Sequence, residues 1–455
     1  MNETQNISEF VYSISFNKIP DRILDLAKRY ILDLIGSAIF GTKTPWGKII
    51  IDFSLSNSGN GDSTILGVTG GRYRPLMAAL ANGTCAHGFE LDDVHSPSIS
   101  HPGAAVIPAV LALGETYNVS GKNIIESVIV GYEVMGRIGS AIAANHIAKG
   151  FHPTGTFGVF GAAAACSKLL GLSPDEIQDA LGIAGSSASG IMQFSIKGSM
   201  VKRIHAGNAA EQGMKSALLA KKGFTGPREI LEGKYGFCKV FTDIDGKIDW
   251  EKMVEGLGKK YKIEEINVKP SPACNILHAV VDCIKMIEVE RKIYEEQMDE
   301  ILVSGHENLI HEHNTYEPDS ILSAQYSLPF TVGLTIEGKI DDPNVYLDES
   351  ILKNKGILNI ASKVRTKLDK DIQKDFPDKF GAKVSIRFKD GETIEKMVSN
   401  PKGSNDNPFS EEELEIKFRN LVEDSIGKDK TSILINRVNS IESIKNIRKL
   451  FKDIY

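Results

Sequence analysis

Apolar residues recur every three or four positions through most of the chain up to about residue 267, which is the spacing of helices that bury one face. Because stretches such as Ala162–Cys166 are apolar on every side, we expect several of these helices to be buried all round in a compact core. The pattern predicts six helices: Ile19–Ile39, Ala104–Thr116, Gly121–Ala144, Gly158–Leu170, Ser173–Ser187 and Ala209–Lys221.

Beyond about Asn267 the pattern alternates or becomes rich in β-branched residues, which indicates strands. Strands are predicted at Glu300–Ser304 and Ala382–Phe388, and the dipeptide Asp390-Gly391 predicts a hairpin turn after the second. Residues 268–400 are therefore expected to form a small α+β domain. Helical spacing in this part and after it predicts four further helices: Ile276–Val289, Ile351–Val364, Ser410–Val422 and Ser440–Phe451.

Composition supports two kinds of domain. Residues 141–220 contain 16 Ala, 11 Gly and only 10 charged residues, whereas residues 341–420 contain 31 charged residues and only 6 Ala and Gly together. The whole chain of 455 residues has 53 basic and 59 acidic side chains, a net charge of −6, and no block of Lys and Arg. This balance lacks the basic footprint of nucleic-acid binding, so we exclude nucleic acid as the main ligand.

The cysteines and the N-terminal segment bear on the compartment. Five cysteines are few for this length, and none forms a CxxC pair of the kind that holds zinc or an iron–sulfur cluster. The N-terminus has no basic leader, and the apolar stretch from Tyr30 to Phe40 is short and interrupted by Asp33. We therefore expect a cytoplasmic protein without a membrane partner.

Polar residues that can carry chemistry gather first in residues 85–103, where three histidines and three carboxylates lie within 15 positions. His and carboxylate side chains together perform acid–base chemistry or bind metals, but the spacing is not that of a helical metal motif. The Ser, Pro and Gly content predicts an irregular loop entering a helix. The alternative is a polar loop whose Asp residues cap helices.

Two further clusters lie before predicted helices. His152 stands in a Gly- and Pro-rich turn before an almost uncharged helix, whose N-terminus attracts anions, although it can equally be a cap or a packed residue. Lys202, Arg203 and His205 stand at the entry of another helix and need an anionic partner. Either a structural carboxylate or a small polycarboxylate ligand would satisfy them.

A fourth cluster opens the α+β region. Two prolines fix the backbone around Lys269, and Cys274 and His278 follow at the start of a helix. A thiol there has a lowered pKa or is simply a small buried apolar group. The spacing of His306, His311 and His313 fits no compact metal site, and we expect a solvated loop at these three positions.

In this order, the four clusters resemble the MmgE/PrpD family, which includes 2-methylcitrate dehydratase, cis-aconitate decarboxylase and iminodisuccinate epimerase. The resemblance covers essentially the whole chain. It is carried by Phe89-Glu90-Leu91-Asp92-Asp93-Val94-His95 with His101-Pro102, Gly150-Phe151-His152-Pro153-Thr154, Lys202-Arg203-Ile204-His205-Ala206-Gly207-Asn208-Ala209-Ala210, Gly223-Phe224-Thr225-Gly226-Pro227 and Ala324-Gln325-Tyr326-Ser327-Leu328-Pro329-Phe330.

The resemblance implies a mainly α fold, with a large all-helical domain of residues 1–267 and 401–455 and an inserted smaller α+β lid domain of residues 268–400. It also implies a homodimer and a site without metal or cofactor. Two positions depart from cis-aconitate decarboxylase, which has an Asp where this chain has Glu90 and a lid-entry His where this chain has Cys274. The implied catalytic residues are Asp93, His101, His152, Lys202 and Tyr326, and the implied substrate-binding residues are Glu90, His95, Arg203, His205, Lys269 and Cys274.

Such a site suits chemistry through a carbanion beside a carboxylate, with cationic groups spreading the charge and a histidine moving the proton. We expect a cofactor-independent lyase for a small di- or tricarboxylate, in the first place a hydro-lyase like 2-methylcitrate dehydratase. The alternatives are a decarboxylase or an epimerase of the same family and, in a different class, a non-catalytic binding protein on the same fold. Since the local spacing builds no metal site, activity is expected to survive EDTA.

Overall fold

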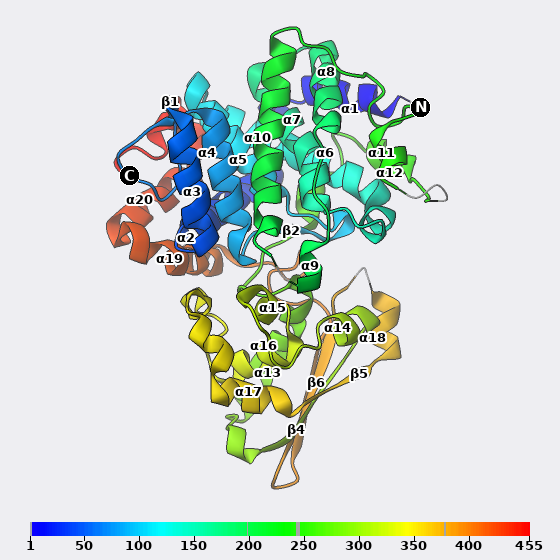
Figure 1. Ribbon diagram of the computed structural model, residues 1–455, viewed down its shortest axis with the longest axis vertical. Coiled ribbons are helices and arrows are strands. Elements are labelled where there is room, and N and C mark those ends of the chain that lie inside the picture. Colours follow the sequence, from blue (N-terminus) through cyan, green and yellow to red (C-terminus); the bar gives the residue numbers. More distant parts are fainter. Residues whose placement is uncertain (1, 198, 243–245, 377–378) are drawn as a thin grey trace. The chain divides into compact units, whose positions relative to one another are not determined.

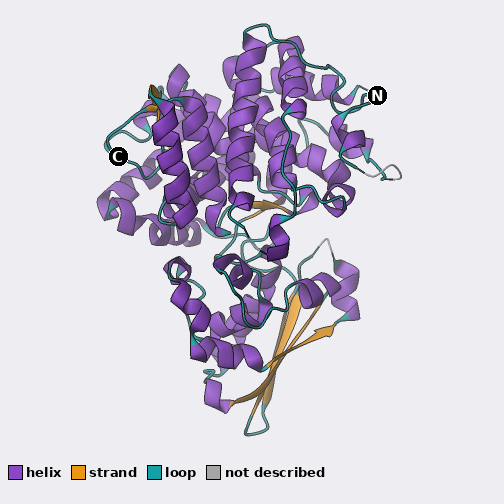
Figure 2. Cartoon of the chain, viewed as in Figure 1, coloured by secondary structure: helices purple, strands orange, loops and turns teal. Residues whose placement is uncertain are grey.

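The computed structural model describes residues 2–197, 199–242, 246–376 and 379–455 (Figure 1). The chain divides into two compact units. One, the helical unit, comprises residues 1–196, 200–267 and 411–455, and the other, the α/β unit, comprises residues 197–199 and 268–410. Helices dominate the cartoon and the longer strands gather in the α/β unit, so the expected mainly α fold is confirmed (Figure 2).

The helical unit is a packed set of long helices. All six predicted helices are present. The spacing did not reveal the long helices α1, α3, α4 and α20 or the short helices α9, α11 and α12. The bounds are α1 Glu3–Ser13, α2 Asp21–Gly41, α3 Pro45–Ser58, α4 Pro75–Ala86, α5 Pro102–Tyr117, α6 Gly121–Ala148, α7 Pro153–Leu170, α8 Pro174–Ser186, α9 Phe194–Lys197, α10 Val201–Lys221, α11 Phe237–Val240, α12 Trp250–Val254, α19 Glu411–Ile426 and α20 Lys428–Asn439.

One predicted helix is wrong. Over Ser440–Phe451 the chain instead forms two single 3-10 turns, Ile441–Ser443 and Ile447–Lys449, joined by an extended residue, Ile444. Apolar side chains of both turns are buried. An irregular segment can therefore show the apolar spacing that is typical of a helix, because its apolar residues pack into the core.

Small residues let the central helices approach closely. On α10, Gly207 faces Gly83 of α4, and a Cβ added to Gly83 would lie 2.9 Å from the Gly207 Cα. Further along α10, a Cβ added to Gly213 would lie 2.5 Å from the Ala162 side chain of α7. The Ala and Gly enrichment of this region therefore sets the distances between backbones in the core.

The α/β unit is built on a four-stranded sheet in the order β5-β4-β6-β7. Strand β4 (Met298–Gly305) is parallel to β5 (Val364–Leu368) and antiparallel to β6 (Ala382–Phe388), which pairs with β7 (Thr393–Val398) in the predicted hairpin. The helices include α13 (His278–Glu290), α14 Glu307–Glu312, α15 Ile321–Gln325, α16 Leu328–Ile336, α17 Lys355–Ser362 and α18 Lys370–Asp375. The helix expected over Ile351–Val364 is shorter, because Asn354 caps α17 and Val364 already begins β5.

Residues 401–410 pack with the α/β unit, although we expected them in the helical domain. The Val268 amide donates to the Gly403 carbonyl at 2.8 Å, and the Lys402 amide donates to Asp282 Oδ2 at 2.6 Å. These bonds tie the returning chain to the start of the same unit.

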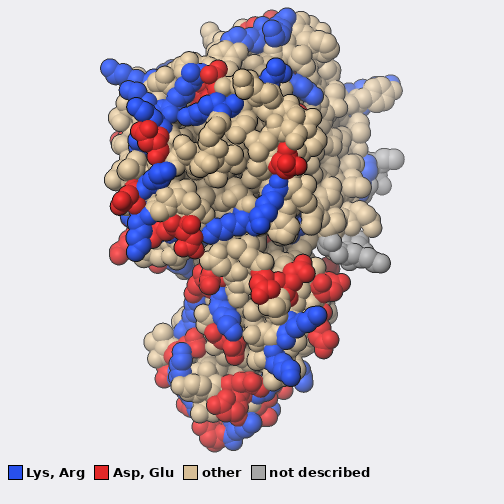
Figure 3. Space-filling model, turned by 60° about the vertical axis from the view of Figure 1, so that its left-hand side comes forward, with Lys and Arg blue, Asp and Glu red and all other residues tan. Residues whose placement is uncertain are grey.

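The surface carries both signs of charge, as the visible face in Figure 3 shows for each unit. Among the described residues, the longest and most apolar helices fall short of what a membrane-crossing segment requires.

A buried ion pair and a hydrogen bond connect the C-terminal helix α19 to α2 and to the loop after α4. Lys417 of α19 donates to Asp33 Oδ1 of α2 at 2.6 Å and to the carbonyl oxygen of Leu91 at 3.0 Å. Both side chains of the pair are buried. Leu91 lies between Glu90 and Asp92, so this lysine holds the backbone of the first polar cluster.

We expect Lys417→Met to lower the free energy of unfolding by about 3–5 kcal/mol, because the buried Asp33 loses the cation that Lys417 supplies. Urea unfolding measures the loss. The control is Lys374→Met, whose exposed pair with Asp371 should contribute nothing measurable. Adding Asp33→Asn to Lys417→Met should recover part of the loss, and a double variant as unstable as the sum of the single ones would contradict the pairing.

Candidate active site

Three helices begin at one place in the helical unit. His101 and His152 are the N-caps of α5 and α7, each followed by a proline at the first helical position, and Lys202 lies in the first turn of α10. The imidazole of His87, just after α4, bridges the first two, with ring centroids 4.7 Å from His101 and 5.8 Å from His152. Helix starts present unpaired N–H groups and a positive dipole end, so the place attracts anions.

Asp92 lies between two of these imidazoles. Its Oδ2 is 2.7 Å from His87 Nδ1 and 3.3 Å from His101 Nδ1. His87 and Asp92 are fully buried, and the His101 side chain is 13% exposed. The loop that brings them together turns through left-handed backbone at Glu90 and Ile99, a conformation that is uncommon for residues other than glycine.

The charge states follow from burial and contact. Burial opposes the ionisation of Asp92, but the electrostatic effect of the adjacent His101 and His87 rings outweighs it and holds the pKa of Asp92 well below its usual value. Burial lowers the pKa of His87 to about 3, against the opposing effect of Asp92. His87 is therefore neutral near pH 7 and donates its Nδ1–H to the Asp92 carboxylate.

The second pair of histidines also shares a hydrogen bond. His152 Nδ1 and His205 Nδ1 are 2.9 Å apart, so one ring donates and the other accepts. Burial is the main cause that lowers the pKa of both, assisted by the charge of His87 at His152 and of Lys202 at His205. Both rings are neutral near pH 7 and are able to take up a proton if a nearby anion stabilises it.

The cationic residues of α10 have partners inside the unit. Lys202 contacts Glu90, and both side chains are buried. Arg203 donates its Nε–H to the Gly88 carbonyl at 3.1 Å and stacks its guanidinium 3.8 Å from the Trp46 ring centroid. The structural carboxylate is thus one of the two expected partners, and it also presents the lysine beside the histidine cluster.

Asp93 and His95 brace the same loop. Asp93 accepts hydrogen bonds from the Gly103 amide at 2.9 Å and the Tyr132 hydroxyl at 2.6 Å. Burial raises the pKa of Asp93 to about 7, although the Tyr132 hydrogen bond opposes this shift. His95 bonds to Ser98 Oγ at 2.7 Å and to Glu265 at 3.0 Å.

Comparison with known proteins identifies the family. The MmgE/PrpD N-terminal domain matches residues 5–247 and the MmgE/PrpD C-terminal domain matches residues 271–441. The chain belongs to the MmgE/PrpD family.

Relatives of this MmgE/PrpD protein extend over almost its whole length. A cis-aconitate decarboxylase-like protein, oryM, of Aspergillus oryzae is 29% identical over 99% of this chain and 96% of its own. The cis-aconitate decarboxylase of Aspergillus terreus is also 29% identical, over 99% and 95% of the two chains, and that of Homo sapiens is 28% identical over 97% and 92%. The expected enzyme class, a lyase, is confirmed.

Sequence reasoning left out two of the residues that form this cluster, His87 and Asp92. The predicted set contained Asp93 instead of its neighbour. Adjacent residues in extended backbone face opposite ways, so of two consecutive aspartates only one is expected to face a given site. The Asp-Asp pair therefore gave the signal, but the sequence alone did not say which carboxylate faces the histidines.

The remaining predicted residues lie in the α/β unit. Lys269 is fully buried, and Cys274 is partly buried. The Cys274 amide donates to the Gln325 carbonyl at 2.8 Å, which brings Cys274 next to the segment that carries Tyr326.

The solvated loop expected at residues 306–313 is wrong for two of its three histidines. His306 is buried, accepts from the Leu309 amide as the cap of α14, and stacks 4.1 Å from the ring of Phe376. His313 is buried too and donates to the Tyr326 carbonyl at 2.8 Å. The charged residues next to these histidines in the sequence suggested an exposed loop. The sequence does not show that a histidine among them caps a helix or stacks on an aromatic ring.

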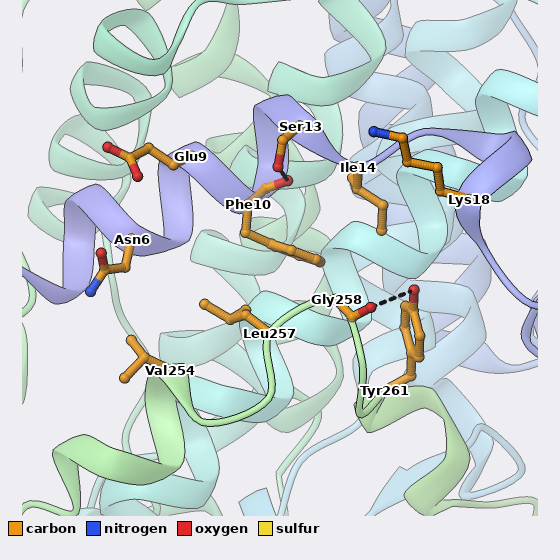
Figure 4. Close-up of a pocket in the computed structure, with 10 residues that line it drawn as sticks. All are labelled: Asn6, Glu9, Phe10, Ser13, Ile14, Lys18, Val254, Leu257, Gly258 and Tyr261. Atoms are coloured by element: carbon orange, nitrogen blue, oxygen red, sulfur yellow. Dashed lines mark hydrogen bonds between the residues drawn. The ribbon is translucent and has the colours of Figure 1, made fainter.

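A cavity elsewhere in the helical unit has a different character (Figure 4). It measures about 490 Å³ and is lined by α1 and by residues 254–261. Phe10, Ile14 and Leu257 contribute apolar surface, and no predicted site residue takes part. We therefore place the candidate active site at the histidine cluster.

The two adjacent aspartates offer a matched test. Asp92→Asn should lower kcat by about 10²–10⁴, because the imidazoles of His87 and His101 lose their carboxylate partner. Asp93→Asn should change kcat much less. Steady-state kinetics on both variants measure this, and a larger loss for Asp93→Asn would restore Asp93 as the catalytic carboxylate.

Asp93 should also leave a pH signature in stability. Its pKa is near 7 in the folded chain and about 3.9 when unfolded, so the folded state binds more protons between these values and stability falls as pH rises through this window. Asp93→Asn removes that dependence. Urea unfolding of both proteins at pH 4, 6 and 8 should show the variant gaining roughly 1–4 kcal/mol relative to the wild type from pH 4 to pH 8. A constant difference would contradict the raised pKa.

Proposed function

We propose that the protein is a cofactor-independent lyase that decarboxylates a small tricarboxylate resembling cis-aconitate. The sequence patterns alone favoured a hydro-lyase like 2-methylcitrate dehydratase, but relatives named cis-aconitate decarboxylase cover 97–99% of this chain and favour decarboxylation. The observation that carries the proposal is the meeting of three helix starts and Lys202 around His87, His101 and His152.

The electrostatics supply the binding energy for a polycarboxylate. Helix starts at His101 and His152 offer N–H donors, and Lys202 and Arg203 add positive charge in a buried setting where Coulomb attraction is strong. The substrate would share Lys202 with Glu90 rather than meet an unpaired lysine. Buried ion pairs of this kind keep a cation in place before the ligand arrives.

The chemical step needs one proton donor. When a carboxylate leaves as CO₂, the C–C bond breaks and its electron pair stays on the carbon skeleton, conjugated with a remaining carboxylate. His101, whose Nδ1 lies 3.3 Å from Asp92 Oδ2, then donates a proton to that carbon. Solvent returns the proton to His101, which is the more exposed of the two rings beside Asp92.

The hydro-lyase remains the second candidate because of two positions. Glu90 and Cys274 differ from the Asp and His of the cis-aconitate decarboxylase pattern, and each changes the size of a side chain expected at the substrate. A longer carboxylate on one side and a smaller thiol on the other would suit a substrate of different shape.

Product analysis by ¹H and ¹³C NMR in D₂O distinguishes these reactions. We expect EDTA-treated protein to release CO₂ from cis-aconitate and to leave one deuterium in the product, with the rate falling about 10²–10⁴-fold in His101→Ala or His152→Ala. His311→Ala, an exposed histidine, is the control. Dehydration of 2-methylcitrate without any CO₂ release would establish the hydro-lyase instead, and epimerisation would show as solvent exchange without loss of a group.

We further propose that Lys269 binds a carboxylate of the substrate and that Tyr326 contributes to the reaction. A lysine ammonium attracts a carboxylate as a point charge. A dicarboxylate inhibitor should therefore slow hydrogen exchange in residues 266–275. Lys269→Ala should weaken inhibitor binding and abolish the protection, and unchanged protection in the variant would exclude Lys269 from substrate binding.

A further inference from the structure

The same cluster has the composition of a metal-ligand set. His87, Asp92 and His101 each offer a nitrogen or oxygen atom, and these three atoms lie within 4.8 Å of one another. The intervals between the histidines and carboxylates of residues 85–103 match no helical metal motif. Intervals along the sequence do not show which side chains the fold brings together. The fold brings the three side chains together from the end of α4, the following loop and the start of α5.

We propose that His87, Asp92 and His101 bind a divalent transition-metal ion of the zinc class, and that the bound ion inhibits the enzyme. Ligand atoms on one zinc ion stand about 2.0–2.2 Å from the metal and hence roughly 3–3.5 Å from each other. The distances from Asp92 Oδ2 to His87 Nδ1, 2.7 Å, and to His101 Nδ1, 3.3 Å, are close to that range.

Unsatisfied polar atoms at the same place support a ligand. Among the described residues, no hydrogen-bond partner is found for the buried His87 Nε2, Asp92 Oδ1 or His101 Nδ1, whose approach to Asp92 lacks hydrogen-bond alignment. Buried polar atoms are normally paired, so orphan atoms on all three neighbouring side chains indicate that the cluster accommodates a further ligand. Of these atoms, His101 Nδ1 also belongs to the set whose spacing fits the ion.

The ligand types select the ion. Two imidazoles and one carboxylate suit zinc and similar transition metals, whereas calcium and magnesium prefer all-oxygen sets. Three protein ligands leave a further coordination position for water or a carboxylate. Such an ion replaces the proton that His87 shares with Asp92 and occupies the His101 nitrogen that faces the carboxylate.

Inhibition follows from that competition and rests on the proposed function, whereas metal binding does not. A cation on His101 prevents the ring from delivering a proton to carbon. Proton and metal thus exclude each other on the same three side chains.

Cobalt provides a visible probe of the site. We expect CoCl₂ titrated into the EDTA-treated full-length protein to give one equivalent of d–d absorption typical of four or five ligands, which ZnCl₂ displaces. Asp92→Asn should weaken cobalt binding about 10–100-fold or more, because a ligand is lost. His101→Gln, at the partly exposed ligand, repeats the test should Asp92→Asn fold poorly. His311→Ala should bind cobalt like the wild type.

Kinetics complete the test. ZnCl₂ should lower kcat for cis-aconitate turnover in the wild type, and EDTA should restore the full rate. An affinity for cobalt that is unchanged in Asp92→Asn and His101→Gln, or that is lost in His311→Ala, would overturn the site. Activity that is lost with EDTA and restored by zinc would overturn inhibition, because the ion would then be a cofactor. Cobalt binding without turnover of any organic acid would refute the proposed function while supporting the metal site.

Discussion

The close approach of three helix backbones is the constraint on which the rest of the site depends. Gly83 of α4 and Gly207 of α10 face each other so tightly that a single Cβ would fall 2.9 Å from the opposite Cα. Gly155 of α7 is similarly crowded, since a Cβ there would lie 3.2 Å from the Cβ of His205. These contacts fix where α7 and α10 begin, and the beginnings carry the histidines. A larger side chain in this interface would therefore displace the helix starts and the histidines that they carry.

Burial then decides which groups carry charge. The same desolvation lowers the pKa of His87 and His152, raises the pKa of Asp93, and opposes the ionisation of Asp92. Only Asp92 escapes this rule, because two imidazoles meet one of its oxygens. The site thus holds the neutral rings of His87 and His152 beside one stabilised anion, Asp92, with cations supplied by α10. Such a region has little charge of its own to repel an incoming polycarboxylate.

The helix pattern could be predicted from the sequence because a buried helix needs apolar residues at its own period. The Asp390-Gly391 hairpin was equally accessible, since its turn residues have a local conformational cause. Other features depend on partners far along the chain. The segment Ser440–Phe451 buries apolar residues without being a helix, and His306 is buried against Phe376 although its sequence neighbours are charged. The choice of Asp92 over Asp93 depends on the path of the loop, which Lys417 fixes from a helix 326 positions away.

A carboxylate shared by two imidazoles serves proton chemistry and metal binding by the same geometry. Proton transfer needs the heavy atoms about 2.7–3.3 Å apart, and the ligands of one zinc ion are separated by nearly the same distance. Two factors decide between these uses: how far solvent reaches the ring, and whether substrate is bound. An anionic substrate at the helix starts would occupy the position where a metal ion completes its coordination. Of the two rings beside Asp92, the more exposed one, His101, is both better placed to exchange protons with water and the one that a metal ion would reach first. The exposure that makes proton turnover possible is therefore also what makes the site open to metals.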